Sequence, residues 1–277
     1  MTDRVLIEHI APSRPRELGC HLFIPDRARS TGVAPLVVAV HGISLNALEQ
    51  VESFAAHASA RGAVVLAPCF DTPEDRDYQR LGRRGRGRRA DLALDEVIDR
   101  LSREAEIRFS RRFLFGYSGG GQFVHRYLMT HPDRVDAAVV AAAGWYTFPD
   151  AKLAYPMGLR VGGVLPGVQI DPARFLTVPV LAIVGSLDVE RDESVRTTTK
   201  VDERQGGTRV ERARRWIDAM QSAARGRSIP ARHALVELPA AGHSFLECVE
   251  HGLAEATFDF FDSIEKPPCA RTESPSR

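Results

Sequence analysis

The chain has 277 residues, of which 44% are hydrophobic and 7% aromatic, and its formal net charge is +1. This length and composition suit one large domain with a single core, and the near-neutral charge argues against nucleic acid as a partner. No apolar run is long enough to span a bilayer, and the first residues lack the basic and apolar regions of a secretory signal. We therefore expect a cytoplasmic protein with no membrane partner, and the composition leaves the oligomeric state open.

Expected strands and helices alternate along the sequence. The expected strands span 5–10, 19–24, 35–40, 63–67, 112–115, 135–143, 178–184 and 234–238, and the expected helices span 47–60, 91–106, 121–129, 209–224 and 247–264. This alternation predicts an α/β protein with a mostly parallel, doubly wound sheet flanked by helices. One domain is expected over residues 1–265, and the polar tail over 266–277 is expected to be disordered.

A short loop motif, His41-Gly42-Ile43-Ser44, follows the expected strand at 35–40. An HG loop in this position supplies a backbone N–H to an oxyanion hole in hydrolases, and the N–H of Ile43 is the candidate donor here. We expect His41 to brace the loop, because it precedes the candidate nucleophile along the chain and the catalytic histidine of such enzymes follows it.

Six arginines and three glycines lie between Arg80 and Arg89. Such tracts can bind nucleic acid, but no aromatic residue is interleaved with these arginines. We expect a solvated loop. The alternative that one or two of the arginines hold a carboxylate or phosphate on a substrate stays open.

The most specific motif is Gly116-Tyr117-Ser118-Gly119-Gly120, with an apolar strand before it and a helical pattern after it. This is the setting of a nucleophile elbow, in which the glycines avoid collisions with the strand and the helix. The tight turn exposes the Ser118 hydroxyl and directs the N–H of Gly119 to the place where an oxyanion forms. A Gly-rich loop with a chance serine is the alternative, which the flanking strand and helix disfavour.

Two later strands end in loops that carry a candidate acid and a candidate base. Asp188 follows the strand at 178–184, and His243 follows the strand at 234–238. The carboxyl ends of parallel strands meet at one edge of a sheet, so Ser118, Asp188 and His243 can converge there. His243 would take the proton of Ser118, and Asp188 would hold the imidazole tautomer.

Other acids, histidines and cysteines have weaker settings. Glu190 and Asp192 follow Asp188 closely, and the polar stretch at 190–207 is expected to be a loop. The remaining candidates lie inside helix or strand patterns: His125, His233 and His251. The cysteines lack metal-ligand spacing and are expected to stay reduced: Cys20, Cys69, Cys248 and Cys269. Cys248 could line the site, although a buried and inert thiol is preferred.

With these motifs in this order, the chain resembles the serine hydrolases of the α/β-hydrolase fold over roughly residues 33–261. It is more loosely similar to the dienelactone-hydrolase and polyhydroxybutyrate-depolymerase-like esterases. The resemblance implies a triad with an oxyanion hole, and neither a metal nor an organic cofactor. It also implies a short lid-like insertion at 144–175, whose aromatic residues line the substrate pocket. A connecting loop with those aromatic residues packed on the core is the equal alternative.

We predict a serine hydrolase that cleaves a small carboxylic ester through an acyl-enzyme. The same triad serves amidases, peptidases and acyltransferases. A non-catalytic binding protein is a further alternative, which the presence of all three triad residues disfavours. The motifs do not identify the substrate, because one fold hosts many chemistries.

Overall fold

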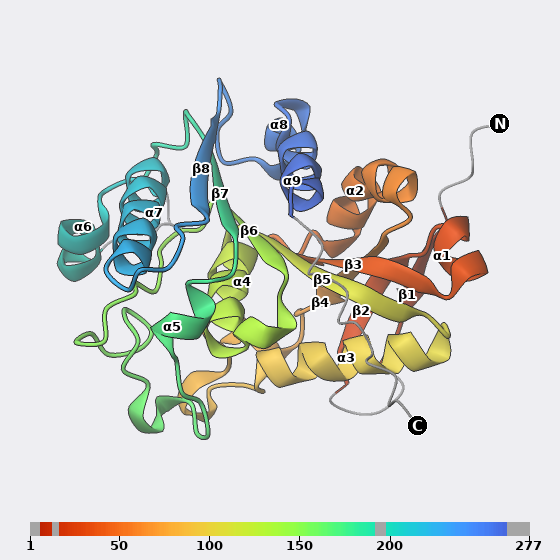
Figure 1. The fold of residues 1–277 in the computed structure, drawn as a ribbon, viewed down its shortest axis with the longest axis horizontal. Helices are drawn as coiled ribbons and strands as arrows, with labels where there is room; N and C mark the ends of the chain where they lie inside the picture. The colour runs from red at the N-terminus through yellow and green to blue at the C-terminus, as the bar shows by residue number, and fades with distance from the viewer. Residues whose placement is uncertain (1–5, 13–16, 192–197, 265–277) are drawn as a thin grey trace, which may run out of the picture.

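The computed structural model describes residues 6–12, 17–191 and 198–264 (Figure 1). The strands of these residues form one eight-stranded sheet in the order β1-β2-β4-β3-β5-β6-β7-β8. Their bounds are β1 Ile7–Ile10, β2 Gly19–Phe23, β3 Val33–Val40, β4 Val64–Cys69, β5 Arg108–Tyr117, β6 Ala137–Ala141, β7 Val180–Gly185 and β8 His233–Leu238. Strand β2 runs antiparallel to β1 and β4, and all other pairs are parallel. The expected mostly parallel sheet is confirmed, and the tail expected at 266–277 lies outside the described residues.

Helices cover both faces of the sheet (Figure 1). Their bounds are α1 Asp26–Thr31, α2 Ala47–Arg61, α3 Ala90–Glu104, α4 Gly119–Thr130, α5 Pro172–Phe175, α6 Thr199–Gln205, α7 Arg209–Arg225, α8 Phe245–Glu250 and α9 Leu253–Asp262. Helices α2, α8 and α9 supply the core on one face, and α3, α4 and α7 supply it on the other. Central strands are therefore buried on both faces, as parallel strands require: Val38 and Val40 face one core, and Ala39 faces the other.

Two predictions for the last third of the chain differ from the structure. The single helix expected at 247–264 is two helices, because Gly252 has φ +92° and starts α9 in a new direction. The loop expected at 190–207 contains α6. This short helix buries Val201, and its Asp202 pairs with the buried Arg212 of α7. Residues 192–197 of the same stretch lie outside the described residues.

The expectation of a solvated loop at Arg80–Arg89 is wrong for four of its six arginines. Arg80 and Arg83 face Asp77, Arg88 faces Asp75, and Arg89 faces Asp91. The three carboxylates are almost completely buried, and a buried charge is costly unless it is paired. The segment is therefore folded around these ion pairs, and Arg84 and Arg86 are its exposed arginines.

The aromatic residues of the 144–175 insertion are packed into the protein. Tyr146 is fully buried and stacks on Trp216 of α7, with ring centroids 4.6 Å apart. Trp145 is also buried and lies against the guanidinium of Arg126, 4.3 Å from its ring centroid. These contacts favour the alternative in which the aromatic residues belong to the core.

No helix of the described ranges has both the length and the hydropathy that a membrane crossing requires.

Candidate active site

Ser118 lies in a strained turn between β5 and α4. Its backbone has φ 52° and ψ −110°, a conformation that residues other than glycine rarely adopt. A Cβ atom on Gly116 would lie 2.3 Å from the carbonyl oxygen of Gly120, and one on Gly120 would lie 1.8 Å from that of Val40. Both obstacles are backbone atoms that cannot rotate aside. The two glycines are therefore required for the turn, which has the geometry of an elbow.

The structure brings Ser118, His243 and Asp188 into one hydrogen-bonded series. The Nε2 atom of His243 lies 3.2 Å from Oγ of Ser118, and its Nδ1 atom lies 2.7 Å from Oδ2 of Asp188. The side chain of Asp188 is 1% exposed, whereas that of His243 is 26% exposed. A buried carboxylate thus orients an imidazole whose other nitrogen faces the serine. The catalytic roles of the three residues stay a prediction at this point.

The loops that carry Asp188 and His243 are packed directly on each other. A Cβ atom on Gly185, the last residue of β7, would lie 2.3 Å from the carbonyl oxygen of Ala241. The N–H of Leu187 donates to that same carbonyl at 2.9 Å, and the N–H of Asp188 donates to the carbonyl of Gly185 at 3.0 Å. Backbone contacts therefore set the spacing between the acid and the imidazole.

Arg209 holds the second oxygen of Asp188, and the sequence analysis missed it. Its Nη1 donates to Oδ1 of Asp188 at 2.9 Å, and both side chains are 1% exposed. This leaves Oδ2 to accept from His243. Arg209 is the first residue of α7, where a cation is unfavourable because the helix N-terminus carries partial positive charge. An arginine in that position is the signal that could have indicated a nearby carboxylate.

The loop after β3 lies directly against the elbow. A Cβ atom on Gly42 would lie 3.2 Å from Cβ of Ser118 and 3.6 Å from the backbone nitrogen of Gly119. In the described part of the chain, neither the N–H of Ile43 nor that of Gly119 donates a hydrogen bond. Both predicted donors are therefore free to meet an oxyanion.

Tyr78 and Gln79 lie at the same place, and no motif indicated them. A Cβ atom on Gly119 would lie 2.7 Å from Nε2 of Gln79 and 2.8 Å from the hydroxyl oxygen of Tyr78. The Tyr78 hydroxyl donates to the carbonyl of His41 at 3.0 Å. The buried Arg126 of α4 holds this turn, because its Nη1 donates to the carbonyl of Gln79 at 2.6 Å. The polar side chains of Tyr78 and Gln79 thus lie next to the candidate oxyanion donor Gly119.

The expected bracing role of His41 is confirmed. Its ring is buried, with Nδ1 2.7 Å from the carbonyl oxygen of Gly42 and Nε2 accepting from the N–H of Phe70 at 2.9 Å. These partners require a neutral ring with its proton on Nδ1. Burial also lowers the pKa of His41, which favours the neutral form.

Among the described residues, the other candidates have different partners or settings. His125 is fully buried between the carbonyl of Gly121 and the N–H of Thr147, and His251 is exposed. Glu190 is exposed, and Asp192 lies outside the described residues. Cys248 is 1% exposed, which confirms the expectation of a buried thiol, and burial raises its pKa, which favours the interpretation that the thiol is inert.

His233 is expected to make the protein sensitive to acid. It is 3% exposed, neither ring nitrogen has a partner among the described residues, and burial lowers its pKa to about 4. An unfolded histidine has a pKa of about 6.5, so between about 6.5 and 4 the unfolded state binds the proton first. The stability present above this window should fall by up to about 3 kcal/mol as the pH drops through it.

Urea denaturation between pH 7 and pH 4 checks this expectation. His233→Leu should flatten the loss of unfolding free energy over the window, whereas His251→Ala, at an exposed position, should keep the wild-type slope. An unchanged slope in His233→Leu would show that another group carries the acid sensitivity.

Solved structures with similar folds support the architecture, although neither a protein-family model nor a curated protein matches the sequence. A poly(aspartic acid) hydrolase-1 from Sphingomonas sp. KT-1 has a TM-score of 0.76 at 22% identity, over 92% of this chain and 98% of that one. A poly(3-hydroxybutyrate) depolymerase from Bordetella parapertussis has a TM-score of 0.74 at 23% identity, over 96% of this chain and 92% of that one. An S-formylglutathione hydrolase from Agrobacterium tumefaciens has a TM-score of 0.60 at 13% identity, over 94% and 95%. Together with the sheet order and the elbow, these likenesses show that the chain has the α/β-hydrolase fold.

Proposed function

We propose that this protein is a serine hydrolase that cleaves carboxylic esters through an acyl-enzyme. The observation that carries the proposal is the hydrogen-bonded series from Asp188 through His243 to Ser118, set at a strained elbow. The names of similar structures, which include a thermostable esterase and a poly(3-hydroxybutyrate) depolymerase, support the same chemistry.

The geometry assigns a role to each member of the series. As Oγ of Ser118 attacks the ester carbonyl, Nε2 of His243 takes its proton and later delivers it to the leaving alcohol. Asp188 accepts from Nδ1, which fixes the tautomer that leaves a lone pair on Nε2, and its charge stabilises the imidazolium. Arg209 keeps the carboxylate in that orientation.

Backbone N–H groups next to Ser118 would stabilise the charge that develops on the ester oxygen. The N–H of Gly119 opens α4, so it combines a hydrogen bond with the positive end of the helix dipole. The N–H of Ile43 is the second donor. The amide of Gln79 lies beside Gly119 and is a candidate third donor from a side chain.

Exposed apolar side chains around the series favour an apolar acyl group. Five of the most exposed large hydrophobic residues lie close in sequence to Ile43, Asp188 and His243, on the loops after β3 and β7 and at the start of α8. They are Ile43, Leu45, Leu187, Val189 and Leu246, each at least 50% exposed. Apolar residues gathered at a surface site mark a place that binds an apolar ligand. We therefore propose an ester with an apolar acyl chain as the substrate.

Other features are consistent with a reaction on a small molecule in a reducing compartment. The described cysteines Cys20, Cys69 and Cys248 are free, which suits the cytoplasm. The triad chemistry requires neither a metal nor an organic cofactor. The near-neutral net charge of the chain argues against nucleic acid as a partner.

Ser118→Ala should abolish the hydrolysis of an activated ester and the covalent labelling by a fluorophosphonate, since no other hydroxyl occupies the elbow. Circular dichroism should show an intact fold. Labelling that persists in the variant would place the nucleophile elsewhere. A wild-type protein that neither labels nor turns over any ester would support the alternative of a binding protein.

Asp188→Asn should lower kcat for the same ester by on the order of 10⁴-fold, because an amide can donate to Nδ1 and so favour the wrong imidazole tautomer. Steady-state kinetics on the folded variant measure the loss. Glu190→Gln, at the nearby exposed acid, is the control and should retain wild-type kcat. Equal losses of kcat in the two variants would show that Asp188 is not the acid that orients His243.

The acyl preference should depend on the exposed leucines beside the triad. For the wild type, kcat/KM should rise by up to about fourfold for each added acyl methylene, because each buried methylene contributes about 0.8 kcal/mol. Leu187→Ser and Leu246→Ser should reduce this increase, whereas Leu92→Ser on α3 should not. Matched amides belong in the same panel, and comparable ester and amide rates would favour the amidase or peptidase alternative.

A further inference from the structure

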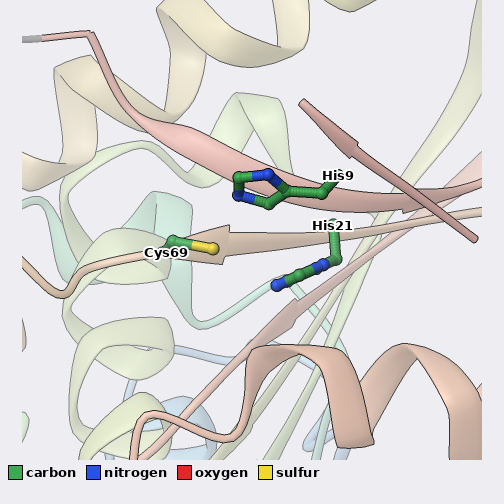
Figure 2. A group of neighbouring side chains, drawn as sticks. All are labelled: His9, His21 and Cys69. Carbon is green, nitrogen blue, oxygen red and sulfur yellow. The ribbon is translucent and has the colours of Figure 1, made fainter. Parts of the chain in front are cut away.

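A second group of reactive side chains lies on the antiparallel edge of the sheet. Figure 2 shows His9 of β1, His21 of β2 and Cys69 of β4 directed toward a common point. One nitrogen of each imidazole and the sulfur of Cys69 all lie within 4.8 Å of one another. The triad uses none of these residues.

The strand register places the three side chains on one face. His9 is directly opposite His21 in the β1–β2 pair, and Cys69 is opposite Gly19 in the β2–β4 pair. Alternate residues of a strand share a face, so Gly19 and His21 point to the same side as Cys69. Because Gly19 has no side chain, the thiol of Cys69 can approach the ring of His21 diagonally.

We propose that His9, His21 and Cys69 bind a zinc-type divalent ion. Imidazole nitrogen and thiolate sulfur are the ligands that Zn²⁺ prefers, at about 2.0–2.1 Å and 2.3 Å. A tetrahedral site with such bonds holds its ligand atoms roughly 3.3–3.6 Å apart, so the cluster must contract by about 1 Å. His9 is exposed at the sheet edge, where its ring has room to rotate inward.

Negative charge near the cluster favours a cation. Glu52 of α2 and Asp71, two residues after Cys69, both act electrostatically on His21. Asp71 acts in the same way on Cys69. This charge suits a divalent ion, and a water molecule can complete the tetrahedron as the fourth ligand.

Zinc-type ions bind a neutral imidazole and a thiolate, so a cysteine ligand must lose its proton on binding. Binding forms a metal–sulfur bond and releases the thiol proton to solvent.

An ion in this position would be structural. It would join three neighbouring strands, including the four-residue edge strand β1, whose sheet partner among the described residues is β2. It would also fix the end of β4, where Phe70 follows Cys69 and donates its N–H to His41. Removing the ion should therefore loosen β1 while the triad stays assembled.

Titration of the full-length protein with Co²⁺ tests the ligand set. The wild type should show the intense visible bands of a four-coordinate Co²⁺ site and a thiolate-to-cobalt charge-transfer band, both abolished by excess Zn²⁺. Cys69→Ser should lose the charge-transfer band. Cys20→Ser is the matched control, because Cys20 lies in the core on the other face of β2, and it should keep the band.

His9→Ala tests the same site at an exposed position, where the substitution should leave the protein folded. It should weaken Zn²⁺ binding by on the order of 100-fold or more, as measured by competition with a chromogenic chelator. His57→Ala, at a histidine of α2 that faces Glu255, should bind as tightly as the wild type. Zn²⁺ should slow amide hydrogen exchange in β1 of the wild type but not of His9→Ala.

Several outcomes would overturn the proposal. These are the absence of a charge-transfer band in the wild type, its persistence in Cys69→Ser, or wild-type Zn²⁺ affinity in His9→Ala. Ester hydrolysis is a separate readout, because the proposed triad needs no metal. A wild-type protein that forms the Co²⁺ bands but hydrolyses no ester would count against the proposed function and leave the metal site intact.

Discussion

The close approach of Gly120 to the carbonyl oxygen of Val40 is the constraint on which the candidate site depends. A single added carbon at Gly120 would lie 1.8 Å from that oxygen, so the first turn of α4 rests directly on the end of β3. Ser118 in this turn has a positive φ, and the loop after β3 lies against the backbone nitrogen of Gly119. Nucleophile and oxyanion donors, which come from different strands, are therefore positioned by the same backbone packing, and strain at the serine is compensated by the packing of two core layers.

Buried arginines connect loops and helices around the candidate site. Arg209 orients Asp188, Arg126 joins α4 to the turn of Gln79, and Arg212 links α7 to the carbonyls of Gly144 and Gly206. Burying such charges brings little net stability, because desolvation offsets the attraction. Their guanidinium groups instead offer several donors in a fixed plane, so each connects loops that share no regular hydrogen bonds. Burial lowers the pKa of Arg126 to about 9, and the Trp145 ring that its guanidinium lies over is a cation–π partner that favours the charged form.

The parts that could be predicted from sequence are those whose physical cause is local. The glycines around Ser118 are needed by their immediate neighbours, and apolar runs such as the one before Asp188 mark buried strands regardless of what they pack against. What could not be predicted depends on residues far away in the chain. The ion pairs of Arg80–Arg89 need the burial of three aspartates, α6 needs Arg212, and the helix break at Gly252 reflects the packing of α8 and α9 on the sheet. His9, His21 and Cys69 have no motif spacing, because only the order of β1, β2 and β4 makes them neighbours.

The loop that carries Asp188 buries a charged side chain and exposes apolar ones. Asp188 must be desolvated to act on the imidazole through a short hydrogen bond, and it is 2% exposed, yet Leu187 and Val189 on either side of it are more than 50% exposed. The turn after β7 thus buries a charged side chain and leaves its two apolar neighbours in solvent, which is the reverse of the arrangement that burial alone favours. An exposed apolar pair next to the carboxylate that orients the imidazole is the feature that links the proposed chemistry to the proposed substrate class.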